Sequence, residues 1–424
     1  MYHAFLLLFL AISATTIFAV KGAWYFPFKL FLFFNAVMGI GILVQLDLRE
    51  EADYVHGVVI VLTSFLLLVA GIGFSRATQN ARAAIWRWRG IDLNRLPTRD
   101  VNVALVFYGV SLAATALYFY IVGYNVFLSA IFDSISPEEV TTMRLATYST
   151  ESYYAPGYFN QFKNIIFPCA AAAIVTYIAH RVKSLIMRVV ALCFILIPLL
   201  VGLLGTGQRA FLISAVIFAL IFMSLTNPNI FWRHKLLMAA LLFFSIALFS
   251  ISSFLQGRVG DFSATTSFTG LFSRFFLENQ FSAVVGFRYI YPQNIQWGAE
   301  WLIDIVGALP YVAGSDLANR IFEVLYGTTR GTAPVSLWGS VYHNFGFAGI
   351  VVVPILLPFV YGSLTTRLLS RRRVGVLEAA AVSYVFFVLG SWVASGPMQL
   401  INNGLLTALL LLYVVDFLKR VRFS

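Results

Sequence analysis

Long apolar stretches separated by polar links run along almost the whole chain. Eleven of them approach the length of about 20 residues that a helix needs to cross a bilayer. They cover residues 4–20, 25–46, 55–73, 102–122, 164–180, 189–204, 210–225, 236–254, 342–365, 376–393 and 403–417. The alternating ten-residue segments of an outer-membrane barrel are absent. The pattern therefore predicts an all-α, polytopic membrane bundle of about eleven helices, with residues 1–424 forming one integral membrane domain.

Composition and charge agree with a membrane protein. Hydrophobic residues make up 60% of the chain and charged residues only 11%, a balance that water-soluble domains do not reach. The net charge of +11 is explained by basic residues in the cytoplasmic links, where they are also attracted to anionic lipid. Nucleic acid is therefore not an expected partner.

Alternate links collect the basic residues, which predicts that these links and the C-terminus are cytoplasmic. They hold Arg76, Arg82, Arg87, Arg89, Arg95, Arg99, Arg181, Lys183, Arg188, Arg233, Lys235, Arg371, Arg372, Arg373, Lys419, Arg420 and Arg422. The opposite links carry most of the acids, namely Asp47, Glu50, Glu51, Asp53, Glu138, Glu139, Glu151, Asp304 and Asp316. Those links are expected on the outer side.

Two outer links are long, at residues 123–163 and 255–341, and chemistry is expected there because long loops in a compact protein are usually functional. Within the second, Leu271, Phe272, Phe275 and Phe276 share one helical face, and Leu317, Ile321, Val324 and Leu325 share another. Such helices could lie flat in the outer interface. No predicted span has an acid near its middle, which counts against ion-coupled transport.

Outer arginines are the candidate ligands of an anion, because guanidinium binds phosphate oxygens in a bidentate manner and stays charged in apolar surroundings. They are Arg144, Arg209, Arg258, Arg288, Arg320 and Arg330, together with Arg274, which is spaced to pair with Glu278. Arg209 stands out in "GTGQRAFLIS", where two glycines and the start of a helix could form an anion cradle. Each arginine has an alternative interpretation, as a surface ion pair or as a side chain that reaches lipid headgroups.

His343 lies where the long outer link meets the next span and could accept a proton from a hydroxyl, although an interfacial structural histidine fits equally well. Metal-binding motifs such as HExxH or an outer carboxylate cluster are missing, so neither metal nor cofactor is predicted. Aromatic residues of the outer links, including Trp338 and Tyr342, could stack on sugars with Asn344 beside them, or could anchor the protein in the interface.

Two stretches resemble bacterial O-antigen and oligosaccharide repeat-unit polymerases, the Wzy family. "LLGTGQRAFLISAVIFALIF" is similar to that family's glycine-rich turn with an arginine before a mid-chain helix. "GTTRGTAPVSLWGSVYHNFGFAGIVVVPILLPFVYG" is similar to its Pro-containing loop followed by Tyr-x-Asn-Phe-Gly-x-x-Gly, and Arg320 precedes Gly331 by the spacing of a family arginine motif. Members of this family often have an acidic residue directly after the glycine that precedes this Tyr. Here Ser340 occupies that position, after Gly339. The layout matches over roughly residues 100–416.

The resemblance implies a glycosyltransferase C-like bundle in the bacterial inner membrane, with a periplasmic site that includes part of residues 255–341. It implies polymerisation of undecaprenyl-diphosphate-linked units for O-antigen, and hence lipopolysaccharide, with a chain-length co-polymerase as a candidate partner. Arg209, Arg258, Arg288, Arg320, Arg330 and Arg144 are the expected diphosphate ligands, and His343 or Glu278 is the expected proton acceptor. Related O-antigen ligases have a wider spacing between the histidine and Gly-x-x-Gly, which favours a polymerase. A ligase, a lipid-linked oligosaccharide flippase and a non-catalytic partner of a biosynthetic complex remain alternatives.

Overall fold

The described part of the chain is helical throughout its regular elements. The computed structural model describes residues 2–20, 23–24, 26–73, 98–132, 136–146, 156–226, 273, 277–292, 294–309, 312–328, 331–370 and 375–420. No strand occurs among these residues, which confirms an all-α protein.

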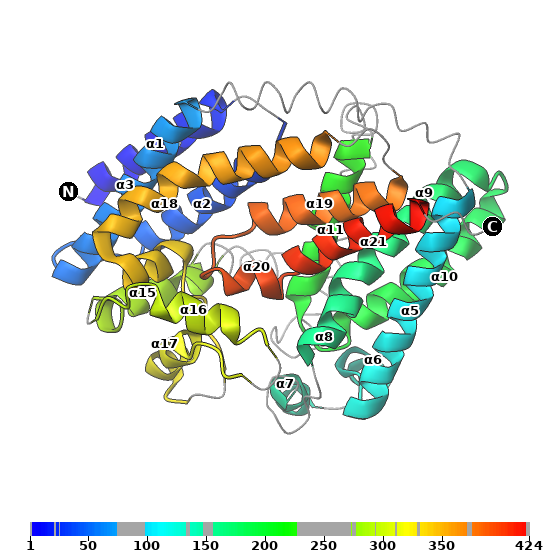
Figure 1. The fold of residues 1–424 in the computed structure, drawn as a ribbon. Helices are drawn as coiled ribbons and strands as arrows, with labels where there is room; N and C mark the ends of the chain where they lie inside the picture. The colour runs from blue at the N-terminus through cyan, green and yellow to red at the C-terminus, as the bar shows by residue number, and fades with distance from the viewer. Residues whose placement is uncertain are drawn as a thin grey trace. The chain divides into compact units, whose positions relative to one another are not determined.

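Each apolar stretch that the structure describes forms a helix (Figure 1). These helices are α1 (Tyr2–Ala19), α2 (Pro27–Leu43), α3 (Glu51–Gly73), α5 (Thr98–Val122), α9 (Phe167–Arg181), α10 (Leu185–Leu204), α11 (Arg209–Thr226), α18 (Leu337–Leu369), α19 (Val376–Gly390) and α21 (Leu405–Arg420). The predicted span at 236–254 lies outside the described residues. Five helical segments are long and apolar enough to cross a membrane, at Glu51–Gly73, Arg99–Val122, Gly157–Arg181, Leu185–Leu204 and Leu337–Leu369, and further apolar helices are shorter. The protein is thus membrane-embedded, while the number of eleven spans stays a prediction.

Both long links that are predicted to lie outside contain short helices. The first has α6 (Val126–Phe132), α7 (Pro137–Ala146) and α8 (Pro156–Gln161), and the second has α15 (Asn279–Tyr289), α16 (Ala299–Val306) and α17 (Leu317–Tyr326). The stripe that begins at Leu317 is confirmed as a helix, α17, in which Leu317 and Ile321 are buried whereas Val324 is 49% exposed. The stripe predicted at 271–276 lies outside the described residues, and α15 begins only at Asn279.

The chain folds into two compact units, and each contains elements distant in sequence. Unit 1 comprises residues 1–84, 268–370 and 388–402. In it, α3 packs against α1 and α18, and α15 packs against α2, α3 and α17 (Figure 1). Its core joins Phe31 of α2 to Trp338 and Tyr361 of α18, with ring centroids 6.3 and 5.6 Å from that of Phe31.

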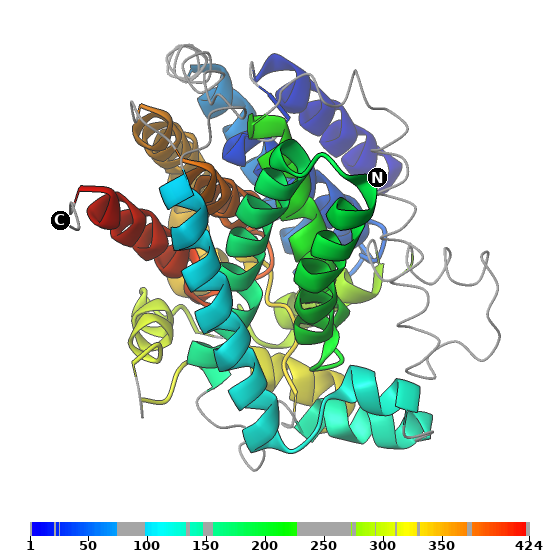
Figure 2. The same cartoon turned by 90° about the vertical axis from the view of Figure 1, so that its right-hand side faces the viewer.

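Unit 2 comprises residues 85–267, 371–387 and 403–424. Helix α9 packs against α5 and α10, and α10 also packs against α11; Figure 2 turns α5, drawn in cyan, toward the viewer. A π-helical turn, η2 (Phe162–Ile166), joins α8 to α9. Such turns widen a helix by one residue and occur frequently at functional sites.

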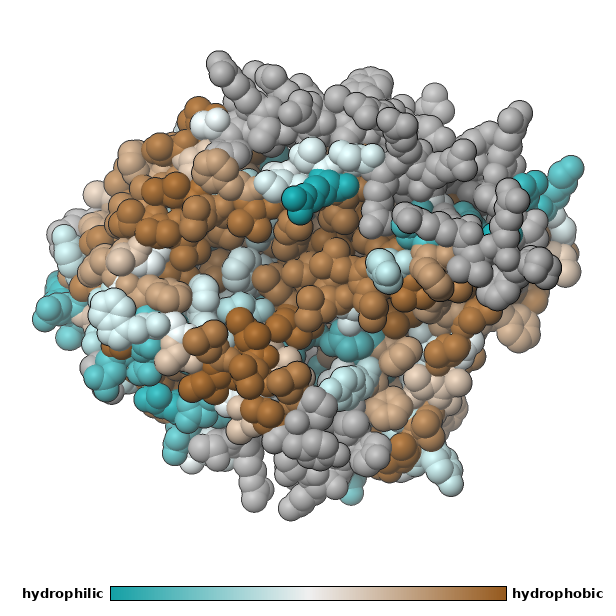
Figure 3. Space-filling model, in the orientation of Figure 1, coloured by the Kyte–Doolittle hydropathy of each residue, from teal (hydrophilic) through white to brown (hydrophobic). Residues whose placement is uncertain are grey.

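Several helices turn large apolar side chains outward, as a lipid-facing surface requires. On α10, Ile186 is 75% and Phe194 is 74% exposed. On α18 the exposed residues include Val352, Leu356 and Val360. Figure 3 shows hydrophobic side chains over much of the face in view. Exposed apolar area of this extent fits contact with lipid rather than with water.

Candidate functional site

The late helix α18 is broken within the Tyr-x-Asn-Phe-Gly-x-x-Gly block. Gly346 has φ 57° and ψ −149°, a combination that only glycine adopts readily. In a continuous helix the carbonyls of His343 and Asn344 would accept from N–H groups four residues later. Here they accept from the backbone N–H groups of Gln296, at 2.9 Å, and Gly298, at 3.2 Å. The break therefore fixes the segment before α16 onto the start of α18.

Replacing Gly346 by alanine is expected to destabilise the protein. The positive φ costs a residue with a side chain about 1–3 kcal/mol, and the added Cβ would lie 2.9 Å from Cδ1 of Ile295. Thermal unfolding in detergent measures the effect. The matched control is Gly109→Ala in α5, where nothing lies within 4 Å of an added Cβ. Equal unfolding temperatures for the two variants would contradict the role given to Gly346.

A network of polar side chains gathers beside this break, all within unit 1. Asn344 is fully buried, and its Nδ2 donates to Oε2 of Glu300 at 2.7 Å and to the carbonyl of Ser340 at 2.9 Å. Its Oδ1 accepts from the backbone N–H of Trp301 at 3.2 Å. The indole N–H of Trp301 donates to Oγ of Ser340 at 2.8 Å. Asn344 thus holds α16 against α18 and orients the carboxylate of Glu300, while the sugar-binding role predicted for it remains untested.

A second carboxyl group, that of Asp304, lies one helical turn after Glu300 on α16. Burial, and next the negative charge of Glu300, raise the pKa of Asp304 from 3.8 to about 6. Backbone N–H groups of Ser315 and Met398 donate to this carboxyl group and oppose the rise in its pKa. The carboxyl group therefore takes up and releases a proton close to neutral pH.

The stability of the protein should fall as pH rises from about 4 to 6, because the folded state holds the proton of Asp304 over a range in which the unfolded state has released it. Asp304→Asn removes this penalty. We expect the variant to match the native protein near pH 4 and to be more stable at pH 7.5, by on the order of 1 kcal/mol after allowance for solvent screening. Thermal unfolding at the two pH values measures the difference. A gap that is independent of pH would contradict the assignment.

The histidine and the aromatic residues predicted from the sequence lie on the first turns of α18. His343 is only 3% exposed, and its Nδ1 has no hydrogen-bonding partner among the described residues. Tyr342 is partly exposed and its ring lies 5.2 Å from that of Phe287. Trp338 is fully buried, and its indole N–H donates to Oδ1 of Asn35 at 2.7 Å. Of the predicted sugar ligands, therefore, Tyr342 is the one with accessible surface.

Among the described residues, the arginines predicted to bind phosphate do not form one cluster. Arg288, at the end of α15, makes a bidentate ion pair with Asp53, at 2.8 and 2.6 Å, so its charge already has a partner. Arg320 is exposed on α17. The side chains of Arg144 in α7 and Arg209 in α11, and all of Arg258 and Arg330, lie outside the described residues. Glu278 is exposed just before α15 and accepts from Oγ of Ser273 at 3.3 Å.

The GTGQR turn, residues 205–209, links α10 to α11 in unit 2. Gly207 has φ 70°, and its N–H donates to the carbonyl of Leu204 at 2.8 Å. Gly205 is packed tightly, since an added Cβ would lie 2.2 Å from Cζ of Phe119. Thr206 is 2% exposed, and its Oγ1 has no hydrogen-bonding partner among the described residues. The turn therefore places an unpaired hydroxyl beside the N-terminus of α11, where backbone N–H groups give a positive potential.

Sequence reasoning missed two charged residues of these regions. Lys163 of η2 is completely buried, whereas the residues predicted to bind an anion were all arginines. One signal was available: residues 159, 160, 166 and 167, three and four positions away, include no acid to pair with it. Glu300 directly precedes the mostly apolar run "WLIDIV", and nothing in this sequence indicates a contact with Asn344. That contact depends on the tertiary structure.

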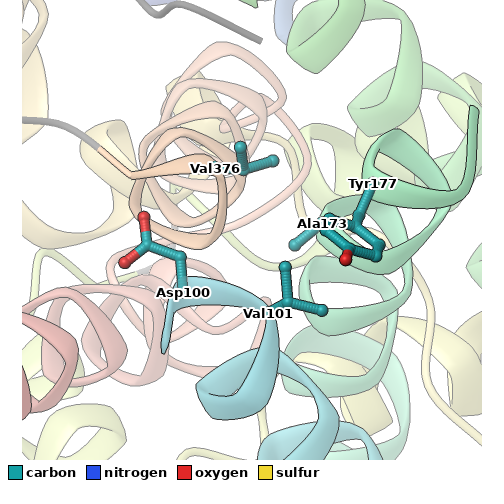
Figure 4. A pocket seen from close by; sticks show the side chains of 5 residues that line it. All are labelled: Asp100, Val101, Ala173, Tyr177 and Val376. Carbon is teal, nitrogen blue, oxygen red and sulfur yellow. The ribbon is translucent and has the colours of Figure 1, made fainter. Parts of the chain in front are cut away.

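A small pocket lies in unit 2 between the start of α5, α9 and the start of α19 (Figure 4). Its lining consists of Asp100, Val101, Ala173, Tyr177 and Val376. The cavity has a volume of about 10 Å³, close to what a single water molecule needs, so it is far too small for a sugar. It also lies at the helix ends that the charge pattern places on the cytoplasmic side. This pocket is therefore not the place to expect an oligosaccharide.

Comparison with known proteins finds no matching protein family, no similar curated protein and no similar solved structure.

Proposed function

We propose that this chain is a membrane glycosyltransferase that polymerises oligosaccharide repeat units carried on undecaprenyl diphosphate. The observation that carries the proposal is the GTGQR turn: the buried Thr206, three residues before α11 begins, has a hydroxyl without a hydrogen-bonding partner among the described residues. This environment favours a phosphate group, because both the hydroxyl and the free N–H groups of a helix N-terminus donate hydrogen bonds to an anion. The resemblance of this turn to the turn of repeat-unit polymerases also points to a phosphate-bearing ligand.

In the proposed reaction the bond between the donor sugar and the lipid diphosphate breaks, and a bond to a hydroxyl oxygen of the next lipid-linked unit forms. The diphosphate leaves with the bonding electrons and gains negative charge. Arg209 would stabilise that charge, with Arg258, Arg320, Arg330 and Arg144 as the further candidates. Donors oriented in advance toward developing charge are worth several kcal/mol each, about 3–4 for one oxyanion donor.

The proton released by the acceptor hydroxyl needs a base, and the polar network at the break of α18 offers one. His343 remains the candidate from the sequence, and the structure adds Glu300. Ser340 replaces the acid that repeat-unit polymerases often carry, but Asn344, one turn later, holds the Glu300 carboxylate at 2.7 Å. Glu300 is therefore a further candidate for the proton acceptor, besides His343 and the exposed Glu278.

The proposed location is the bacterial inner membrane, with the site facing the periplasm and the C-terminus in the cytoplasm. The lipid tails of both substrates would enter between helices from the bilayer, and a chain-length co-polymerase is a candidate partner. The distribution of basic residues supports this orientation.

Deleting the gene and separating surface polysaccharide by electrophoresis tests the proposed function. Loss of the ladder with retention of a single repeat unit on the acceptor lipid is the expected result, and re-expression of the chain should restore the ladder. If the glycan keeps its length on the carrier lipid but no longer reaches its acceptor, the protein is a ligase. If lipid-linked units accumulate on the cytoplasmic side, it is a flippase.

A further inference from the structure

Lys163 is a positive charge buried in unit 2, and none of the described residues forms an ion pair with it. It lies in the π-helical turn η2 and is 0% exposed, and its Nζ has no hydrogen-bonding partner among the described residues. Its position is the seventh residue of the apolar segment Gly157–Arg181, about 9 Å from that end along the helix. An ionisable group at this depth is costly unless it has a function or a partner.

Aromatic rings surround the ammonium group and connect it to the GTGQR turn. Nζ lies 5.0 Å from the ring centroid of Phe211, in the first turn of α11, and 5.9 Å from that of Phe119. The same Phe119 ring packs against Gly205. Cation–π contacts compensate such a charge only in part, with about 2 kcal/mol when desolvated. Lys163 therefore lies against Phe211 in the first turn of α11, and it shares the Phe119 ring with Gly205, the residue before Thr206.

We infer that Lys163 and Thr206, with the N-terminus of α11, form a buried binding site for a phosphate or diphosphate group. The ammonium group supplies the counter-charge, the hydroxyl and the helix N–H groups supply hydrogen bonds, and the rings exclude water. That the ligand is a lipid diphosphate rests on the proposed function, whereas the binding of a phosphate group does not. Two sources share this chemistry: the headgroup of a polyprenyl diphosphate and the phosphate of a bulk anionic phospholipid.

Binding to purified protein in detergent tests the inference, with farnesyl diphosphate, inorganic pyrophosphate, phosphatidylglycerol and farnesol as probes. We expect farnesyl diphosphate to bind and farnesol not to bind, and Lys163→Met to weaken binding of the diphosphate at least tenfold. Lys183→Met is the matched control, because Lys183 is exposed in the link that follows the opposite end of this segment. Equal affinity of the native protein and Lys163→Met would overturn the inference. Binding of phosphatidylglycerol in place of the diphosphates would assign the site to bulk lipid instead.

Thr206→Val provides a second measurement if Lys163→Met fails to fold, because valine keeps the shape of threonine and removes the buried hydroxyl. Binding of farnesyl diphosphate should weaken severalfold in this variant, and an affinity equal to that of the native protein would overturn the inference. The two proposals can fail separately. Diphosphate binding through Lys163 in a protein whose deletion leaves polysaccharide length unchanged would refute only the polymerase function.

Discussion

Replacing Arg209 by alanine is expected to abolish long glycans while leaving the protein in the membrane. Arg209 is the first residue of α11 and follows the turn in which the Thr206 hydroxyl has no hydrogen-bonding partner among the described residues. If the leaving diphosphate binds there, removal of the guanidinium takes away charge stabilisation that develops in the transition state. Loss of one such oriented donor lowers turnover by about 10²–10³. A polymer built by repeated transfer would then stop after the first steps.

The length of surface polysaccharide, separated by electrophoresis, measures this effect in a deletion strain that expresses each variant. Arg49→Ala is the matched control, because Arg49 is an exposed arginine on a link also expected outside. Arg209→Lys distinguishes charge from geometry, since lysine keeps the charge and loses the planar fork. Partial ladders with lysine would indicate that charge dominates. A full ladder with alanine would remove Arg209 from the proposed site.

The helical architecture could be read from the sequence because membrane spans are encoded locally. A run of apolar residues determines its own helix in lipid, so each described stretch between residues 4 and 417 forms a helix. The helix from Leu317 was also predictable, since its stripe has the period of a helix. The break at Gly346 was not predicted, because glycine within an apolar run is common and its φ depends on contacts with residues 296–298.

The candidate sites were harder to predict, because they depend on pairs of residues far apart in the chain. The resemblance identified Asn344 and Gly346 as parts of a motif, but only the fold shows that Asn344 holds Glu300, 44 positions away. Arg288 was expected to be a ligand because it is a cation on the outer side, whereas its partner in the fold is Asp53. Charge at a sequence position shows that a counterion is needed, and the tertiary structure decides which one.

The pair formed by Arg288 and Asp53 therefore predicts that Arg288→Ala destabilises the protein. Asp53 is 0% exposed, and its Oδ2 also accepts the backbone N–H of Asp47 at 2.6 Å. The hydrogen bonds to Asp53 raise the pKa of Arg288 above its usual value. Removing the guanidinium leaves a buried carboxylate without its cation, which typically costs about 3–5 kcal/mol. We expect the lower end of this range, because the Arg288 side chain is 28% exposed.

The double variant Asp53→Asn with Arg288→Ala separates a structural role from a ligand role. Asparagine is uncharged and can still accept the N–H of Asp47, so the double variant should recover most of the stability lost by Arg288→Ala, as measured by thermal unfolding in detergent. If the stable double variant still makes long glycans, Arg288 serves the fold alone. If it is stable but makes only single units, Arg288 also contacts the substrate, and Asp53 orients it. No recovery of stability would mean that the ion pair is not what stabilises this part of unit 1.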